Sequence, residues 1–203
     1  MSASSRPFPE RERAELADLL DKLGPDAATC CAGWTTAHLA AHLAVRDRRP
    51  DALLGFGVEE VAGDGPLPSW AHRLERRLRE STSYPDVVAQ VRSGPPVWSP
   101  LAWPGGRSFN VTEFAIHHED VRRAQPGWTP RSLDRADQDA LWTPATVFAR
   151  RIRGGVVLRR TDVEGVEGVE TTIGAGGRTV AGEPLDLLLW ATGRRDVARV
   201  TVS

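Results

Sequence analysis

Apolar side chains recur at helical spacing along the longer, N-terminal part of the chain. The first such helix covers residues 10–23 and is ended by a Gly-Pro pair; its apolar face comprises Leu16, Leu19, Leu20 and Leu23. The same pattern predicts helices over about residues 36–49, 69–79, 86–92, 108–125 and 133–151. Pro144 lies inside the last of these and predicts a kink or a restart there. These segments predict a helical domain over residues 1–150.

The pattern changes after Gly154 and Gly155. Short β-rich runs follow at residues 156–158, 169–173 and 198–202, and a short apolar helix is expected over 183–191. The glycines at 174–177 predict a hairpin turn rather than a phosphate-binding loop. We therefore expect a mainly α fold with a small C-terminal α+β domain at residues 151–203, and no internal repeat.

One segment, residues 93–106, fits neither periodicity. It is too rich in proline and glycine for a helix or a strand, and it contains Trp98 and Trp103. Two large aromatic side chains predict that the segment packs onto the rest of the protein. It directly precedes the helix expected at 108–125, so it forms either a pocket wall or a packed connector.

Composition and charge narrow the range of functions. Hydrophobic residues make up 40% of the chain, which is enough for a substantial core. A formal net charge of −1 gives no electrostatic case for nucleic acid or an anionic membrane as a partner. No run approaches the roughly 20 apolar residues of a membrane span, no secretory signal is visible, and the adjacent Cys30 and Cys31 build no disulfide framework. We expect a soluble cytoplasmic protein, monomeric or homodimeric.

The helix at 108–125 carries the most informative polar pattern. Glu113 and His117 are four residues apart, which places their Cβ atoms roughly 6 Å apart on one face. A carboxylate oxygen and an imidazole nitrogen can then bind one metal ion. Asp120 lies on a similar face and could accept the second imidazole N–H. His118 points about 100° away from His117, so the two are not expected to share an ion.

A third ligand must come from another segment. His38 and His42 are also four residues apart on an expected helix, and spacing alone does not choose between them. His72 lies among arginines and is expected to be solvated. Cys30 and Cys31 precede the second helix, where a thiol can act as a nucleophile or ligand, although buried packing is the commoner role. The chain contains no zinc-ribbon, G-x-S-x-G, Walker or Rossmann pattern.

Two segments together resemble a known family. CAGWTTAHLAAHLAVRDRRPDA is similar to the second helix of the mycothiol-dependent maleylpyruvate isomerase family, and NVTEFAIHHEDVRRAQPGW is similar to that family's E-x-x-x-H helix. The run GEPLDLLLWATGR also agrees. The family belongs to the DinB/YfiT-like four-helix-bundle metal proteins, and this chain resembles most an actinobacterial subfamily described only as metal-binding.

The resemblance implies a DinB-like four-helix bundle whose metal ligands are His42, Glu113 and His117. It further implies zinc or a similar divalent ion, open coordination positions, and a low-molecular-weight thiol such as mycothiol as co-substrate. The expected function is a metal- and thiol-dependent isomerase or transferase acting on a small molecule. The alternative is a non-catalytic metal- or ligand-binding module, a sensor or scaffold, whose site is closed by a fourth ligand such as His38 or a cysteine. The family's isomerase also uses a C-terminal arginine, for which Arg159, Arg160 and Arg194 are candidates.

Overall fold

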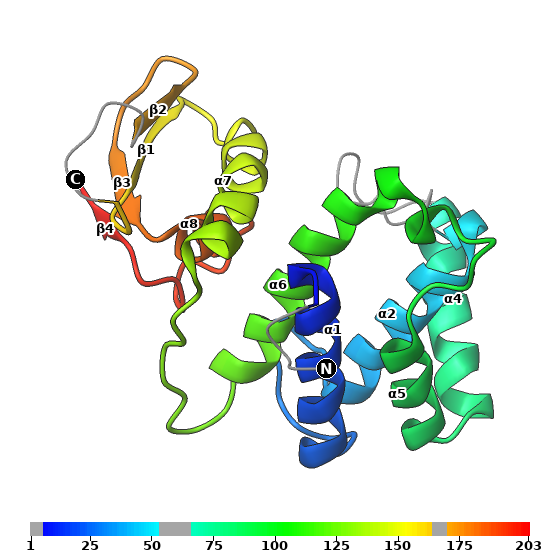
Figure 1. The fold of residues 1–203 in the computed structure, drawn as a ribbon. Helices are drawn as coiled ribbons and strands as arrows, with labels where there is room; N and C mark the ends of the chain where they lie inside the picture. Colours follow the sequence, from blue (N-terminus) through cyan, green and yellow to red (C-terminus); the bar gives the residue numbers. More distant parts are fainter. Residues whose placement is uncertain (1–5, 53–65, 164–169) are drawn as a thin grey trace. The chain divides into compact units, whose positions relative to one another are not determined.

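The computed structural model describes residues 6–52, 66–163 and 170–203, and the chain forms two compact units, Met1–Trp128 and Thr129–Ser203. The fold is mainly helical, with a small four-stranded sheet (Figure 1). The expected mainly α class with a C-terminal α+β part is therefore confirmed. Among the residues that the structure describes, no helix is long and apolar enough to cross a membrane.

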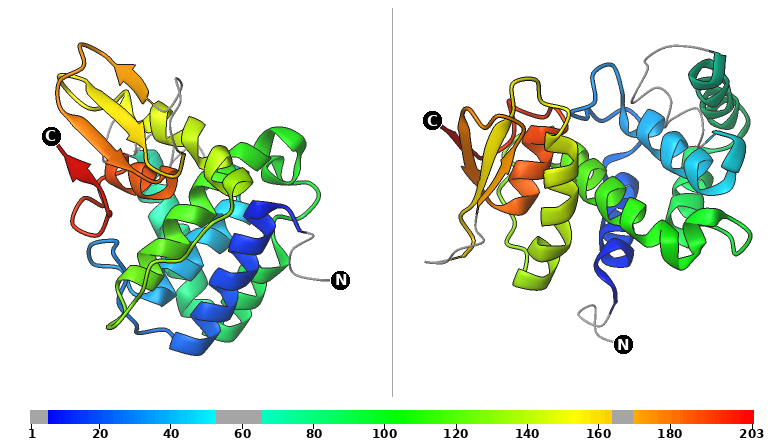
Figure 2. Two further views of the ribbon diagram at one scale, coloured as in Figure 1. Left: turned by 60° about the vertical axis from the view of Figure 1, so that its left-hand side comes forward. Right: turned by 90° about the horizontal axis from the view of Figure 1, so that it is seen from above.

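The regular elements of the first unit, within residues 6–52 and 66–128, are helical. Its α-helices in these residues are α1 (Phe8–Leu23), α2 (Thr36–Arg48), α4 (Pro66–Ser81), α5 (Tyr84–Ser93) and α6 (Arg107–Arg123). Helix α1 packs on α5 and α6, and α2 packs on α4 and α5, as two views of the ribbon show (Figure 2). Helices that are distant in sequence thus lie side by side, which brings α2 and α6 into one core.

Leucines at helical spacing form the core of this unit, as their pattern predicts. Leu16 and Leu20 of α1 are fully buried, together with Leu39 and Leu43 of α2 and Phe114 of α6. Burial of each such side chain contributes about 1.5–3 kcal/mol, so these five positions tie α1, α2 and α6 together.

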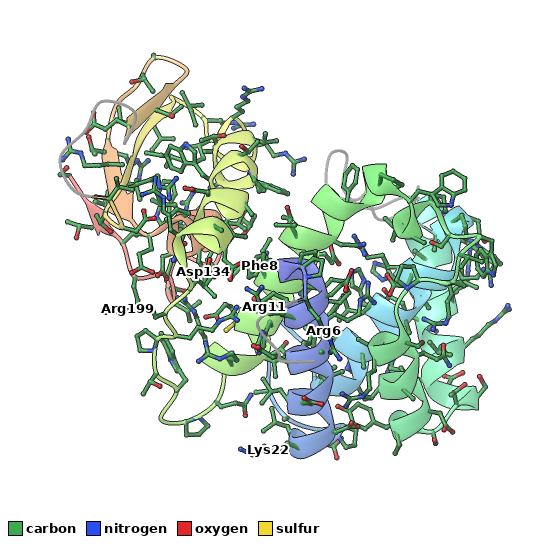
Figure 3. All side chains as sticks on the ribbon, viewed as in Figure 1. Arg6, Phe8, Arg11, Lys22, Asp134 and Arg199 are labelled. Atoms are coloured by element: carbon green, nitrogen blue, oxygen red, sulfur yellow. The ribbon has the colours of Figure 1, made fainter. Side chains whose placement is uncertain are left out.

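Helix α1 shows how local signals define an element. Pro7 precedes the helix. Glu10 lies in its first turn and Lys22 in its last turn, where each charge interacts favourably with the helix dipole. Gly24 then ends the helix with a φ of 77°, a backbone conformation that favours glycine. Phe8 and Lys22 are labelled at the two ends of this helix in Figure 3.

The segment between α5 and α6 differs from its expected packing. It contains two short 3-10 turns, Pro100–Ala102 and Pro104–Gly106, but Trp98 and Trp103 remain 55% and 57% exposed. The segment packs onto the unit as expected, but these two tryptophans do not make the contact. The buried anchor is Leu101 instead, because Gly106 lets its backbone approach: an added Cβ there would lie 2.5 Å from the Leu101 Cα.

The second unit holds a sheet with two helices on one face (Figure 1). Its elements are α7 (Arg135–Ala149), β1 (Val156–Arg160), β2 (Glu170–Ile173), β3 (Thr179–Gly182), α8 (Pro184–Ala191) and β4 (Thr201–Val202). The strand order is β2-β1-β3-β4, with β1 and β3 parallel and the other pairs antiparallel. Strand β3 was not among the expected strands.

Two local expectations are tested in this unit. The glycine-rich turn at 174–177 is not a hairpin turn, because β2 and β3 lie on opposite sides of β1 rather than beside each other. Pro144 causes no restart, since α7 continues through it.

The boundary between the units also lies earlier than the composition change suggests, at 128 and 129 rather than at 150 and 151. The reason is that α7 packs against α8: the Gln138 side chain donates to Glu183 at 2.8 Å and accepts from the Leu185 N–H at 3.1 Å.

Candidate metal centre

Three side chains from two helices converge in the first unit. His42 lies on α2, and Glu113 and His117 lie one turn apart on α6. Glu113 Oε1 is 3.0 Å from His42 Nε2 and 3.3 Å from His117 Nε2. The centroids of the two imidazole rings are 5.4 Å apart, and the ring planes meet at 70°. The structure therefore brings together the three residues that the family resemblance selected.

The far nitrogen of each ring is held by a second carboxylate. His42 Nδ1 donates to Glu75 on α4 at 2.9 Å, and His117 Nδ1 donates to Asp120 at 2.9 Å. Such partners fix the orientation of a histidine so that its other nitrogen faces a metal. The predicted contact between Asp120 and His117 is present, and both Nε2 atoms face the same oxygen of Glu113.

A buried network holds the other oxygen of Glu113. Arg46, one turn after His42 on α2, places its Nε 3.5 Å from Glu113 Oε2. Arg46 also contacts Asp47, which pairs with Arg13 of α1. Asp47 is fully buried, and removing one partner of such a pair costs about 3–5 kcal/mol. The ionic network therefore leaves Glu113 Oε1 as the oxygen directed at the two histidines.

Electrostatics match this arrangement. Burial alone would raise the pKa of Glu113, but the charge of Arg46 and the hydrogen bonds from both histidines hold the pKa well below 4.5. Burial alone would lower the pKa of His117, but its bonds with Asp120, Cys31 and Glu113 raise the pKa well above 6.5. The pKa of His42 is likewise raised, because its two carboxylate partners outweigh the effect of burial. The site is anionic at oxygen and holds its protons at nitrogen.

The other histidines of α2 and α6 have different partners. His38 Nδ1 accepts the backbone N–H of Thr35 at 3.3 Å, at the start of α2. His118 is buried at the interface with α1, where its Nδ1 lies 3.1 Å from Glu12 Oε2. His118 and His117 thus face different surroundings, as their angular separation on the helix predicts. Of the two candidates on α2, only His42 lies beside Glu113.

Cys31 lies behind the site rather than in it. Its thiol donates to Asp120 Oδ2 at 3.1 Å, and its Sγ is 3.9 Å from His117 Nδ1. The Nδ1 edge of the ring is the one turned away from Glu113. Cys31 and His38, the residues that could close the site with a fourth ligand, are both engaged elsewhere.

The three arginines considered for a catalytic role all lie in the second unit and have local partners. Arg159 is exposed and pairs with Glu170, the buried Arg160 chelates Asp162 with two hydrogen bonds, and Arg194 donates to the carbonyl of Thr192. None of these three contacts involves His42, Glu113 or His117.

Sequence reasoning missed Glu75, yet α4 carries a signal for it. Ala71, Leu74 and Leu78 form the apolar face of this charged helix, and Glu75 lies within the same stripe. A carboxylate on an apolar helix face needs a buried partner. His72, expected to be solvated, is only partly so, because its Nδ1 lies 3.0 Å from the second oxygen of Glu75.

The donor set fits a divalent ion of zinc type, which takes imidazole nitrogen and carboxylate oxygen. The side-chain exposures are 12% for His42, 23% for Glu113 and 12% for His117, so the site is shielded but reachable. In the part of the chain that the structure describes, three groups place their possible ligand atoms within 4.8 Å of one another: His42, Glu113 and His117; Cys31, His117 and Asp120; Glu12, Glu15 and His118.

Comparison with known proteins supports the fold. No model of a known protein family matches the chain, and no curated protein matches it either. Among solved structures, the chain is similar to a histidine-to-alanine mutant of the mycothiol-dependent maleylpyruvate isomerase, with a TM-score of 0.55 and 18% identity over 100% of this chain and 95% of that chain. The fold expected from the sequence motifs is thereby supported; at this identity the likeness concerns fold alone.

Proposed function

We propose that the first unit is a DinB-like four-helix bundle that binds one divalent ion, zinc or a similar metal, through His42, Glu113 and His117. The observation that carries this proposal is the convergence of both Nε2 atoms on Glu113 Oε1, at 3.0 and 3.3 Å. In each ring the Nδ1 proton is retained, because it is hydrogen-bonded to a carboxylate. The Nε2 protons are therefore the ones that a cation would replace. A bound ion would also relieve the repulsion between two protonated rings facing each other.

We further propose that the protein is an enzyme of thiol-dependent isomerase or transferase type, acting on a small molecule with a thiol such as mycothiol as co-substrate. Three protein ligands leave coordination positions open, as catalytic zinc sites require. A divalent ion supplies Lewis acidity, which lowers the pKa of a thiol or of water. The structural likeness to a mycothiol-dependent isomerase supports this class. A fourth protein ligand would favour a non-catalytic module instead, but His38 and Cys31, two residues considered for that position, have other partners.

The metal proposal is tested on the full chain purified without a histidine tag. We expect one equivalent of divalent metal by elemental analysis, and its loss in His42→Ala. His38→Ala is the matched control, since it removes a histidine one turn earlier on α2, and should keep the metal. Absence of stoichiometric metal from wild type, or equal content in His42→Ala, would contradict the proposal.

The thiol proposal has a separate readout. After Co²⁺ substitution, addition of a low-molecular-weight thiol should change the visible spectrum of the ion, because the thiol enters an open position. An unchanged spectrum with every thiol tested, in protein that binds Co²⁺ stoichiometrically, would leave a metal-binding protein without thiol chemistry.

A further inference from the structure

The Asp120 carboxylate has two donors on one oxygen. Asp120 Oδ2 lies 2.9 Å from His117 Nδ1 and 3.1 Å from Cys31 Sγ. A carboxylate only accepts hydrogen bonds, so the S–H of Cys31 and the N–H of His117 both donate to it. Asp120 is 1% exposed, so water has little access to replace either donor. The orientation of this carboxylate therefore depends on Cys31 as well as on His117.

The loop before α2 holds Cys31 in place through its own backbone. The neighbouring Cys30 N–H donates to the backbone carbonyl of Asp120 at 2.9 Å, which ties the loop to α6. The Cys31 N–H donates to Thr29 Oγ1 at 3.2 Å, and that hydroxyl donates to the Trp34 carbonyl at 2.9 Å. These hydrogen bonds hold the loop backbone on both sides of Cys31. The backbone position of Cys31, and not its side-chain rotamer alone, therefore places the thiol beside Asp120.

The position of Cys31 separates it from the ligands. His117 Nε2 faces Glu113 Oε1 at 3.3 Å, whereas Cys31 Sγ lies 3.9 Å from Nδ1, on the other edge of the ring. The two nitrogens of an imidazole point in different directions, so a group beside Nδ1 does not reach an ion bound at Nε2. Cys31 acts on such an ion only through Asp120 and the ring.

We propose that Cys31 is a positioning residue of the metal centre: its thiol holds the Asp120 carboxylate, which in turn holds His117 with Nε2 facing Glu113 and His42. This inference rests on the proposed metal-binding function. The order of contacts is Cys31, Asp120, His117 and then the ion. The sequence offered a cysteine as a possible ligand; in this proposal Cys31 instead sets the orientation of one ligand.

Four full-length proteins test the inference: wild type, Cys31→Ala, Cys31→Ser and Cys30→Ala. Zn²⁺ affinity is measured by competition with a chromophoric chelator, and the Co²⁺ form by its visible and near-ultraviolet spectrum. Loss of a group that orients a ligating histidine typically costs about 10–100-fold in metal affinity, and Cys31 lies one contact further out, so we expect Cys31→Ala to weaken Zn²⁺ binding about three- to tenfold. Cys31→Ser keeps a donor and should recover part of that loss.

Cys30→Ala is the matched control, because its backbone N–H bond to Asp120 survives the substitution. It should bind as wild type does. The cobalt ligand-field bands should shift in Cys31→Ala, while wild type should show no thiolate-to-cobalt charge-transfer band. Equal affinities and spectra for Cys31→Ala and wild type would overturn the inference, and a charge-transfer band in wild type would make Cys31 a ligand instead. Failure of wild type to bind metal would refute the proposed function itself, a separate result.

Discussion

Replacing Glu75 by Gln is expected to weaken metal binding although Glu75 is not one of the three proposed ligands. Glu75 Oε1 accepts from His42 Nδ1 at 2.9 Å, and the Glu75 side chain is 9% exposed. Its other oxygen lies 3.0 Å from His72 Nδ1. The carboxylate therefore sits between two imidazoles and fixes the ring of His42 from behind.

The magnitude follows from what each substitution leaves at this position. Loss of such a partner costs about 10–100-fold in affinity, or about 1.4–2.7 kcal/mol. Gln keeps an oxygen that can accept from His42 but loses the charge, so Glu75→Gln should lie near the lower limit, about tenfold. Glu75→Ala leaves the Nδ1–H without this acceptor and should lie near about 100-fold.

The assay is competition for Zn²⁺ with a chromophoric chelator at about pH 8. Glu75 also raises the pKa of His42, so a proton on His42 competes with Zn²⁺. At about pH 8 this competition is weaker, and the change in Zn²⁺ affinity reports mainly the loss of orientation. Glu80→Gln, an exposed carboxylate on the same helix, is the control for a change of charge alone. If both Glu75 variants bind Zn²⁺ as tightly as Glu80→Gln does, the orienting role of this carboxylate is refuted.

Two further predictions concern protonation and backbone strain. Because the pKa values of His42 and His117 are raised in the metal-free protein, Nε2 protons persist above pH 6.5 and must leave when a cation binds. Metal affinity should therefore still rise from about pH 6.5 to pH 8, with proton release detectable by calorimetry in buffers of different ionisation enthalpy; an affinity that is constant over this range would contradict the proton competition. In the second unit, Gly155→Ala should lower the Tm more than Gly154→Ala. Both glycines have positive φ, 80° and 84°, so each substitution costs about 1–2 kcal/mol, but only at Gly155 would the Cβ meet backbone, 2.4 Å from the Ile173 oxygen. This overlap adds about 1–3 kcal/mol, and equal Tm shifts would refute the steric argument.

The helices of the first unit are largely readable from the sequence, because their signals are local. Leu16 and Leu20 repeat at helical spacing and are fully buried, and Gly24 ends the helix as expected. Glu113 and His117 are also local: four residues on one helix place both side chains on the same face, wherever that helix packs. The contact of Asp120 with His117 follows from the same geometry.

Contacts between distant segments were not readable in this way. His42 and Glu113 are 71 residues apart in sequence, and spacing on α2 treated His38 and His42 as equals. Only the burial of α2 and α6 in one core brings His42 beside Glu113 and leaves His38 at the helix start. Glu75 joins them because α4 packs on α2.

The second unit shows the same limit for strands and boundaries. Composition marked a change near Gly154 and Gly155, but α7 belongs with the residues that follow, since it buries its face against α8. The strand order β2-β1-β3-β4 likewise came only from the structure.

By itself, the sequence determined which segments are helical, which faces are apolar, and that a carboxylate and an imidazole share one turn of α6. Spacing left His38 and His42 open, and the family resemblance implied His42. The tertiary structure placed His42 beside Glu113, brought Glu75 of α4 to its other nitrogen, and placed Cys31 behind His117. The physical reason is the distance along the sequence over which the two kinds of interaction act. Backbone periodicity depends on neighbours within one or two turns, whereas the meeting of helix faces depends on how the whole apolar surface of the unit is buried.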